Sequence, residues 1–192
     1  MQGFSIAILC GGRSRRFGSD KTLTLLSGRP ILQHVHQKLR KSSEDIFLVT
    51  KWNVPGKYQF LDIPIVYEPY EKHTPLFGIE QALIHAKYPW VLVVGADMPG
   101  ITPEVIEKLQ VLRDANTRLI LPHTDRFHPL CAFYSKECLQ GIKERIQHKQ
   151  LRLQELSQME GCRVVSFGSD HLRAFTNINT VEDLAQFEKK GQ

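Results

Sequence analysis

The sequence has no hydrophobic run that approaches the roughly 20 residues needed to cross a bilayer. Its first residues, 1–4, lack the basic stretch followed by an apolar stretch that marks a signal peptide. Internal repeats and low-complexity segments are also missing. We therefore expect a cytoplasmic protein with no membrane partner. The length of 192 residues favours a single domain over 1–192.

The four cysteines include no Cys-x-x-Cys pair, so the sequence does not indicate a zinc site. Cys10, Cys131 and Cys162 stand in apolar, strand-like runs. We predict that these three are buried thiols and form neither disulfides nor metal ligands. A serine, cysteine or histidine triad for nucleophilic catalysis is not evident either.

The charge balance is moderately basic, with a net charge of +5. This excess favours an anionic partner but does not identify one. A nucleic-acid-binding protein is expected to place its basic residues on one face, interleaved with aromatic residues. Here much of the positive charge lies near the N-terminus or in helical segments that also carry glutamates. We therefore expect no nucleic-acid partner.

The most informative stretch is 6–21, where an apolar run leads into a glycine-rich, basic turn. The run 6–10 is typical of a parallel strand covered on both faces. Gly11 and Gly12 follow, and then Arg15, Arg16 and Lys21 add positive charge. Bare backbone N–H groups surrounded by cations form a cradle for phosphate. The spacing matches neither GxGxxG nor the P-loop pattern, and a basic surface turn is the alternative interpretation.

Strand-like runs alternate with helical segments of about ten residues along most of the chain. This alternation predicts an α/β fold with a mostly parallel central sheet and helices on both faces. The predicted strands are 6–10, 45–50, 63–67, 90–95, 118–122, 130–134 and 162–167. The predicted helices are 31–40, 75–86, 103–112, 136–148, 151–156 and one after Thr180, with Thr102 and Thr180 as N-caps and Asp183 as the capping-box partner of Thr180.

Asp97 directly follows the most strand-like run of the chain, 90–95. Parallel α/β sheets bind ligands outside the carboxyl ends of their strands, so Asp97 and the 6–21 stretch are expected to meet at one edge. A magnesium ion that bridges substrate phosphates needs one or two carboxylates. We therefore predict that Arg16, Lys21 and Asp97 are catalytic and that Asp97 holds Mg²⁺, since positioning and charge neutralisation dominate phosphoryl transfer. A turn aspartate before Pro99 is the alternative.

The stretch 11–21 resembles GGxSxRxGxDK, the signature of the nucleotidyltransferases related to nucleotide-sugar pyrophosphorylases. From Leu9 to Leu184 the chain is similar to the molybdenum cofactor guanylyltransferase (MobA) branch of that group. Thr-Pro-Leu-Phe-Gly at 74–78 resembles its GPLAG motif, and Asp-Met-Pro at 97–99 resembles its CDxP motif. His-Pro-Leu at 128–130 and the sequence at 177–184, which resembles NxNTPEDL, extend the similarity.

The resemblance implies a three-layer Rossmann-like fold and transfer of GMP from GTP to molybdenum-loaded molybdopterin, with Mg²⁺, releasing pyrophosphate. It implies that residues 1–100 bind GTP and that 101–192 bind molybdopterin. The implied nucleotide contacts are Leu9, Cys10, Gly11, Gly12, Lys21, Thr50, Glu68 and Asp97. Two of these depart from the family: Thr50 stands where asparagine is usual and can equally be an ordinary β-branched strand residue, and the family's aspartate aligns with Glu68 or with Pro69.

Five residues are candidates for the molybdopterin side: His128, Lys149, Arg152, Asn177 and Asn179. Each has a structural alternative. His128 can be a turn residue before Pro129, the two asparagines can bond local backbone, and Lys149 and Arg152 can belong to a solvated helix face. Other proteins of the cofactor pathway are further candidate partners.

Three other functions remain open at this point. The first is a related nucleotidyltransferase that uses CTP or another acceptor. The second is a regulatory protein of the same fold that binds nucleotide without turnover, and the third is an interaction protein with a basic surface. The presence of all three predicted catalytic residues, Arg16, Lys21 and Asp97, argues against a regulatory protein without turnover.

Overall fold

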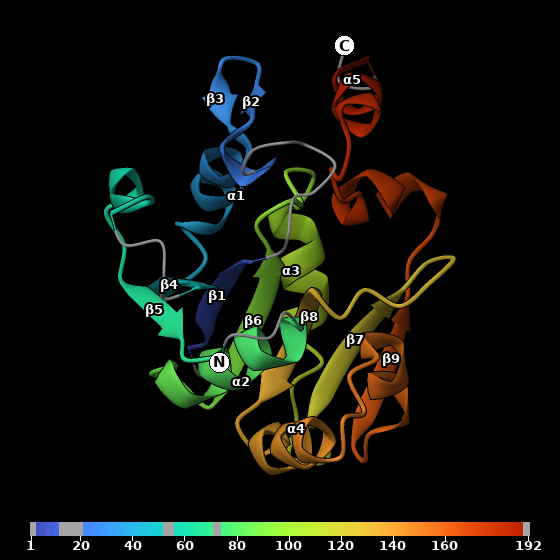
Figure 1. The fold of residues 1–192 in the computed structure, drawn as a ribbon. Coiled ribbons are helices and arrows are strands. Elements are labelled where there is room, and N and C mark those ends of the chain that lie inside the picture. The colour runs from blue at the N-terminus through green and yellow to red at the C-terminus, as the bar shows by residue number, and fades with distance from the viewer. Residues whose placement is uncertain (1–2, 12–20, 52–55, 71–73, 190–192) are drawn as a thin grey trace.

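A seven-stranded sheet runs through the middle of the computed structural model, which describes residues 3–11, 21–51, 56–70 and 74–189 (Figure 1). The strand order is β5-β4-β1-β6-β8-β7-β9, and β8 is antiparallel to both of its neighbours while the other pairs are parallel. The predicted α/β fold with a mostly parallel sheet is therefore confirmed. The strands are β1 (Ser5–Cys10), β4 (Asp45–Lys51), β5 (Ile65–Glu68), β6 (Trp90–Gly95), β7 (Leu119–His123), β8 (Cys131–Ser135) and β9 (Cys162–Ser166).

Within the described residues, four α-helices lie between strands and a fifth follows the last strand, at positions close to the predicted ones. They are α1 (Ile31–Leu39), α2 (Pro75–His85), α3 (Pro103–Gln110), α4 (Cys138–Gln147) and α5 (Val181–Lys189). The predicted helical piece at 151–156 is instead the 3₁₀ helix η3 (Leu153–Gln158). Three further elements were not expected from the sequence: the hairpin of β2 (Leu25–Leu26) and β3 (Arg29–Pro30), and the 3₁₀ helices η1 (Lys21–Leu23) and η4 (Ser169–Phe175).

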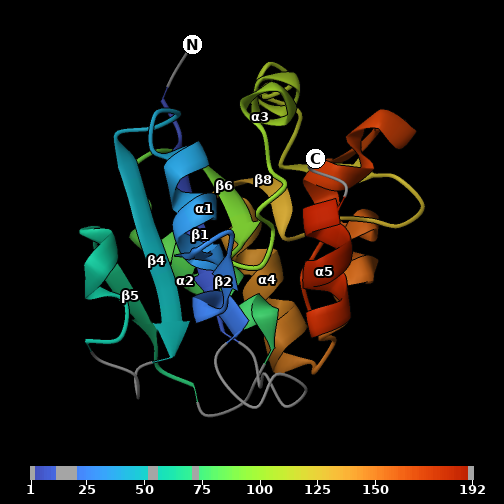
Figure 2. The same ribbon diagram turned by 90° about the horizontal axis from the view of Figure 1, so that it is seen from above.

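The helices form two layers because alternate strand residues point to opposite faces of the sheet. On β1, Ile6 and Ile8 pack with α1 and α3 on one face, whereas Ala7 packs with α2 and α4 on the other. Both faces are thus apolar, as expected for strands that are covered on two sides. Figures 1 and 2 show the resulting three layers, helix–sheet–helix.

Helix α5 lies outside these layers and packs on the β2–β3 hairpin. A third small cluster joins Phe187 of α5 and Ile178 to Leu26 and Ile31. The predicted capping box is confirmed, since Thr180 Oγ1 accepts from the N–H of Asp183 at 3.1 Å and Asp183 Oδ2 accepts from the N–H of Thr180 at 2.9 Å. The C-terminal segment is therefore fixed beside the start of α1.

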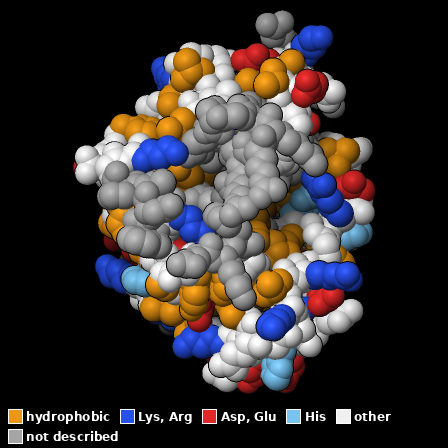
Figure 3. Space-filling view, viewed as in Figure 1, with side chains coloured by type: hydrophobic (Ala, Val, Ile, Leu, Met, Phe, Trp, Pro, Cys, Tyr) orange, Lys and Arg blue, Asp and Glu red, His pale blue; other side chains and the backbone are white. Residues whose placement is uncertain are grey.

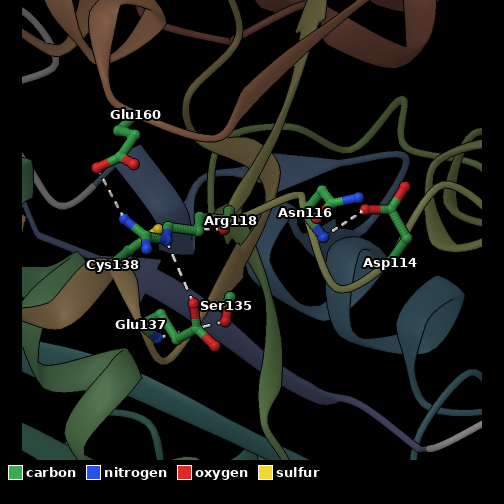
Figure 4. A network of polar contacts seen from close by, with 7 residues as sticks. All are labelled: Asp114, Asn116, Arg118, Ser135, Glu137, Cys138 and Glu160. Carbon is green, nitrogen blue, oxygen red and sulfur yellow. Dashed lines mark hydrogen bonds and ion pairs between the residues drawn. The ribbon is translucent and has the colours of Figure 1, made fainter.

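The amino ends of β7 and β9 carry a network of polar contacts (Figure 4). Arg118 forms ion pairs with Glu137 at 3.2 Å and Glu160 at 3.1 Å, and its carbonyl accepts from the thiol of Cys138. Asp114 caps the turn before this segment by accepting from the N–H of Asn116. The network joins the start of β7 to α4 and to the turn that precedes β9.

Cys10, Cys131 and Cys162 are free thiols as predicted, but their predicted burial is confirmed for two of them and wrong for the third. Cys10 and Cys131 are buried. Cys162 is only half-buried, because β9 is an edge strand with one side facing solvent. Burial raises the pKa of the Cys131 thiol to about 12, so this thiol stays protonated at neutral pH. Within the described part of the chain, no helix has the length and apolarity of a membrane span.

Candidate functional site

A cluster of three side chains from distant parts of the chain lies at the carboxyl edge of the sheet. Lys21 Nζ donates to Asp97 Oδ2 at 2.6 Å and to Asn179 Oδ1 at 2.7 Å. The three residues come from η1, from the end of β6 and from the turn before α5. Two predicted catalytic residues and one predicted molybdopterin residue thus meet at one point.

The position of Asp97 is set by the end of β6. The N–H of Ala96 donates to the carbonyl of Leu9, so the backbone stays paired with β1 up to the residue before Asp97. Gly95 leaves room for the carboxylate, since a Cβ at this position would stand 2.7 Å from Asp97 Oδ1. The carbonyl of Asp97 accepts from the N–H of Ile178 at 2.9 Å. The carboxylate is therefore anchored from both the sheet and the C-terminal segment.

A second charged cluster lies at the ends of β4 and β5. Buried Glu68 is paired with Lys51, and Lys51 also donates to the carbonyl of Tyr70 at 3.2 Å. The Glu68 carboxylate faces Gly78 in the first turn of α2 and Gly11 in the first loop: a Cβ on Gly78 would lie 3.1 Å from Glu68 Oε1, and one on Gly11 would lie 3.7 Å away. Glu68 therefore lies at the base of the site, next to the first loop.

Tyr70 extends this cluster towards α2. Its ring stacks on Phe77 with centroids 4.0 Å apart, and its hydroxyl donates to buried Glu80 at 2.7 Å. The hydrogen bond to Glu80, together with partial burial, raises the pKa of Tyr70 to about 12. The sequence did not indicate Lys51, Tyr70 or Glu80, because a single lysine at the end of a strand, a tyrosine in a loop and a glutamate in a helix form no recognisable pattern.

Thr50, Leu9 and Cys10 lie at this same edge, with their side chains directed into the protein. Thr50 is buried opposite Cys10 in the β1–β4 pair. The thiol of Cys10 lies 3.3 Å from the hydroxyl of Thr22, and the side chain of Leu9 packs against Gly78. Contacts from these three residues to a ligand would therefore come mainly from their backbone. Gly12 and Arg16 fall outside the described residues.

His128 lies in the loop before β8 and is buried. Its ring stacks on Phe175 of η4, with centroids 4.5 Å apart, and Nε2 lies 2.7 Å from the hydroxyl of Thr124. Burial, reinforced by nearby Arg126, lowers the pKa of His128 to about 4. The imidazole is therefore neutral at pH 7 and can offer stacking and one hydrogen bond, but no positive charge.

The remaining molybdopterin candidates fall into two groups. Asn177 and Asn179 follow Phe175 closely in the chain, and Asn179 accepts a hydrogen bond from Lys21. Lys149 and Arg152 lie between α4 and η3 and are exposed, and the guanidinium of Arg152 lies 4.0 Å from the carboxylate of Glu155. His128 packs on η4, which precedes the asparagines in the chain, and among the contacts of the described residues none joins His128 or the asparagines to Lys149 or Arg152.

A family model described as a MobA-like NTP transferase domain matches residues 6–162. The chain belongs to the MobA-like NTP transferase family. It is therefore a nucleotidyltransferase.

Relatives with curated names support the same family. The chain is 31% identical to a "Probable molybdenum cofactor guanylyltransferase" of Aquifex aeolicus, over 92% of this chain and 86% of that protein. It is 32% identical to a protein of the same name from Nostoc sp., over 96% and 90%. Among solved structures, the molybdopterin-guanine dinucleotide biosynthesis protein A of Archaeoglobus fulgidus superposes with a TM-score of 0.81 at 25% identity, covering 97% of this chain and 98% of that one. The Lys21 cluster lies within a fold shared along nearly the whole chain.

Proposed function

We propose that this protein transfers GMP from GTP to molybdenum-loaded molybdopterin, forming the guanine dinucleotide cofactor and pyrophosphate. The observation that carries the proposal is the contact of Lys21 with Asp97 and Asn179 at the carboxyl edge of the sheet. In a nucleotidyltransferase this edge is where a nucleotide is bound. The names of the relatives supply the base and the acceptor.

In the proposed reaction, a phosphate oxygen of the acceptor attacks the α-phosphorus of GTP. The bond to the bridging oxygen breaks, and pyrophosphate leaves with the electron pair. An acceptor phosphate arrives ionised, so no strong general base is required. Lys21 and Arg16 would neutralise the charge that develops on the phosphates, which is the main way a protein accelerates phosphoryl transfer.

The donor set at this edge fits a magnesium ion that is shared with the substrate. In the part of the chain that the structure describes, no three His, Cys, Asp or Glu side chains are grouped as metal ligands, at Asp97 or elsewhere, so a metal here would also need ligands from the substrate. Mg²⁺ commonly binds through one or two carboxylates together with substrate phosphates, and Gly95 leaves the space that the Asp97 carboxylate needs. Asp97 would hold the ion, which would supply charge neutralisation on the triphosphate.

The acceptor would lie on the C-terminal side of the Lys21 cluster. Neutral His128 stacks on Phe175 of η4 beneath the surface, and the amide side chains of Asn177 and Asn179, which follow η4, are suited to hydrogen bonds with a flat pterin. Lys149 and Arg152 would serve as outer cationic contacts. This division corresponds to a GTP part over 1–100 and a molybdopterin part over 101–192.

We propose neither a nucleic acid nor a membrane as a partner of this protein. In the view of Figure 3, the coloured Lys and Arg side chains are interspersed with Asp and Glu and do not gather into one basic patch. A large nucleic acid would need such a patch. The absence of nucleic-acid and membrane partners stays a prediction.

Pyrophosphate release from a panel of nucleoside triphosphates, with and without molybdenum-loaded molybdopterin, tests the proposed function. We expect release only with GTP, acceptor and Mg²⁺ together. Equal release from CTP would point to a related transferase with another base. Binding of GTP without any release would instead favour a nucleotide-binding regulatory protein.

A further inference from the structure

We propose that Asp183 is a positioning residue for the site, because it fixes the turn that places Asn179 on Lys21. This proposal rests on the proposed function for its kinetic part only. Asp183 lies in the first turn of α5, and its Oδ2 accepts from the N–H of Asn179 at 2.8 Å and from the N–H of Thr180 at 2.9 Å. One carboxylate oxygen thus holds two successive backbone groups of the turn.

The turn is also held from the opposite direction. The N–H of Ile178 donates to the carbonyl of Asp97 at 2.9 Å, and the side chain of Ile178 is buried in the cluster with Leu26 and Phe187. Asn179 stands between these two anchors, and its side chain has only two rotatable bonds. The direction of its Oδ1 towards Lys21 Nζ is therefore determined mainly by the backbone that Asp183 holds.

The two side chains of the capping box bind different backbone groups, which distinguishes the positioning role of Asp183 from ordinary helix capping. Thr180 Oγ1 accepts from the N–H of Asp183 at 3.1 Å, which satisfies a free N–H of the helix and stabilises α5. The carboxylate of Asp183 acts in the other direction, on the turn itself. Removing either side chain deletes one half of the same box, but only the loss of Asp183 releases Asn179.

We expect loss of the Asp183 carboxylate and loss of the Thr180 hydroxyl to affect different properties of the protein. Asn179 is exposed, so water can replace the carboxylate on its N–H at little cost in stability. Water cannot keep the turn in one orientation. Loss of Asp183 should therefore affect the geometry at Lys21 more than it affects the folded state.

The first test follows the side-chain amide of Asn179 by ¹⁵N NMR in the full-length protein. We expect its resonances to shift in Lys21→Ala and Asp183→Ala, to return towards the wild-type position in Asp183→Glu, and to stay unchanged in Glu182→Ala. Glu182 is an adjacent exposed carboxylate of the same charge and controls for electrostatics. Unchanged resonances in Asp183→Ala would overturn the proposal, whatever reaction the protein catalyses.

The second test compares kinetics in the two halves of the capping box. Displacement of a catalytic group by about 1 Å can lower the rate by up to about 100-fold, and we expect Asp183→Ala to lower kcat/KM by about tenfold. Thr180→Ala should lower Tm at least as much while kcat/KM stays within about twofold of wild type. Equal losses of kcat/KM in both variants would mean that Asp183 only caps the helix. Absence of any transfer by the wild-type protein would instead contradict the proposed function and leave the NMR result to decide the role of Asp183.

Discussion

Two clusters of charged side chains lie at opposite edges of the same sheet, and they are built differently. At the amino edge, Arg118 is 42% exposed and its partners Glu137 and Glu160 are 67% and 87% exposed (Figure 4). At the carboxyl edge, Lys21 and Asp97 are only 20% and 13% exposed. The first cluster lies in open solvent, whereas the second is partly enclosed by the protein.

We propose from this difference that the exposed cluster serves the fold and that the enclosed cluster serves a ligand. Exposed ion pairs contribute about 0–1 kcal/mol, because water and salt screen them. The Lys21 cluster gathers residues from three distant segments around a carboxylate whose space is left free by a glycine. Such convergence at the carboxyl edge is typical of a ligand site in α/β folds. Substitutions should therefore change activity at one edge and leave it almost unchanged at the other.

The largest effect is expected for the two residues at the centre of the site. Asp97→Ala and Lys21→Ala should each reduce pyrophosphate release at least about 1,000-fold, because charge neutralisation on the phosphates is lost. Circular dichroism and thermal unfolding should show that both variants remain folded. Wild-type activity in Asp97→Ala would remove the metal assignment.

A smaller effect is expected when the Asp97 carboxylate is displaced than when it is removed. In Gly95→Ala the new Cβ would meet Asp97 Oδ1 at 2.7 Å and displace the carboxylate, so we expect kcat to fall by about 10- to 100-fold. Gly141→Ala in α4 is a matched control, since its Cβ would meet only the terminal methyl group of Met159 at 3.2 Å. Equal activity of the two variants would show that the position of the Asp97 carboxylate is not critical.

The neutral state of His128 predicts a pH dependence of stability. Its pKa falls from 6.5 to about 4 on folding, so the unfolded state binds more protons in this range. Stability should therefore decrease as the pH drops from about 6.5 towards 4, by up to about 3 kcal/mol from this residue. Urea unfolding of wild type and His128→Gln at several pH values should show a difference that shrinks on acidification. A difference that is independent of pH would contradict the lowered pKa.

The smallest effect is expected at the amino edge. Arg118→Ala should lower the free energy of unfolding by about 1 kcal/mol or less, since its ion pairs are exposed. Its kcat/KM should equal that of wild type. A loss of activity here would break the contrast between the two edges.

The sequence predicted the parts of this account that depend on local patterns. Apolar runs located the seven strands, and Asp97 was recognised because it follows such a run. Thr102 and Thr180 were recognised as N-caps by their spacing to the helices, and both accept the expected backbone N–H. These features depend on neighbouring residues and are visible in one stretch of chain.

Other features depend on pairings that no single stretch reveals. Strand β8 lies between β6 and β7 and runs antiparallel to both, which depends on how distant strands pair. Cys162 is half-buried because β9 lies at the edge of the sheet. The predicted helix 75–86 is preceded by Thr74, and only the folded chain shows that Thr74 caps α2 by accepting from the N–H of Leu76. The Lys51–Glu68 pair and the Tyr70–Glu80 hydrogen bond likewise join residues that become neighbours only in the folded chain.

The central claim is that Lys21 and Asp97 bind one nucleoside triphosphate with its divalent ion. Water-proton relaxation during titration with Mn²⁺, a paramagnetic substitute for Mg²⁺, tests this claim directly when GTP is present. We expect one protein-bound Mn²⁺ per chain in wild type and in Arg118→Ala, and loss of this binding in Asp97→Ala and Lys21→Ala. Binding of Mn²⁺ and GTP by Asp97→Ala with wild-type affinity would contradict it.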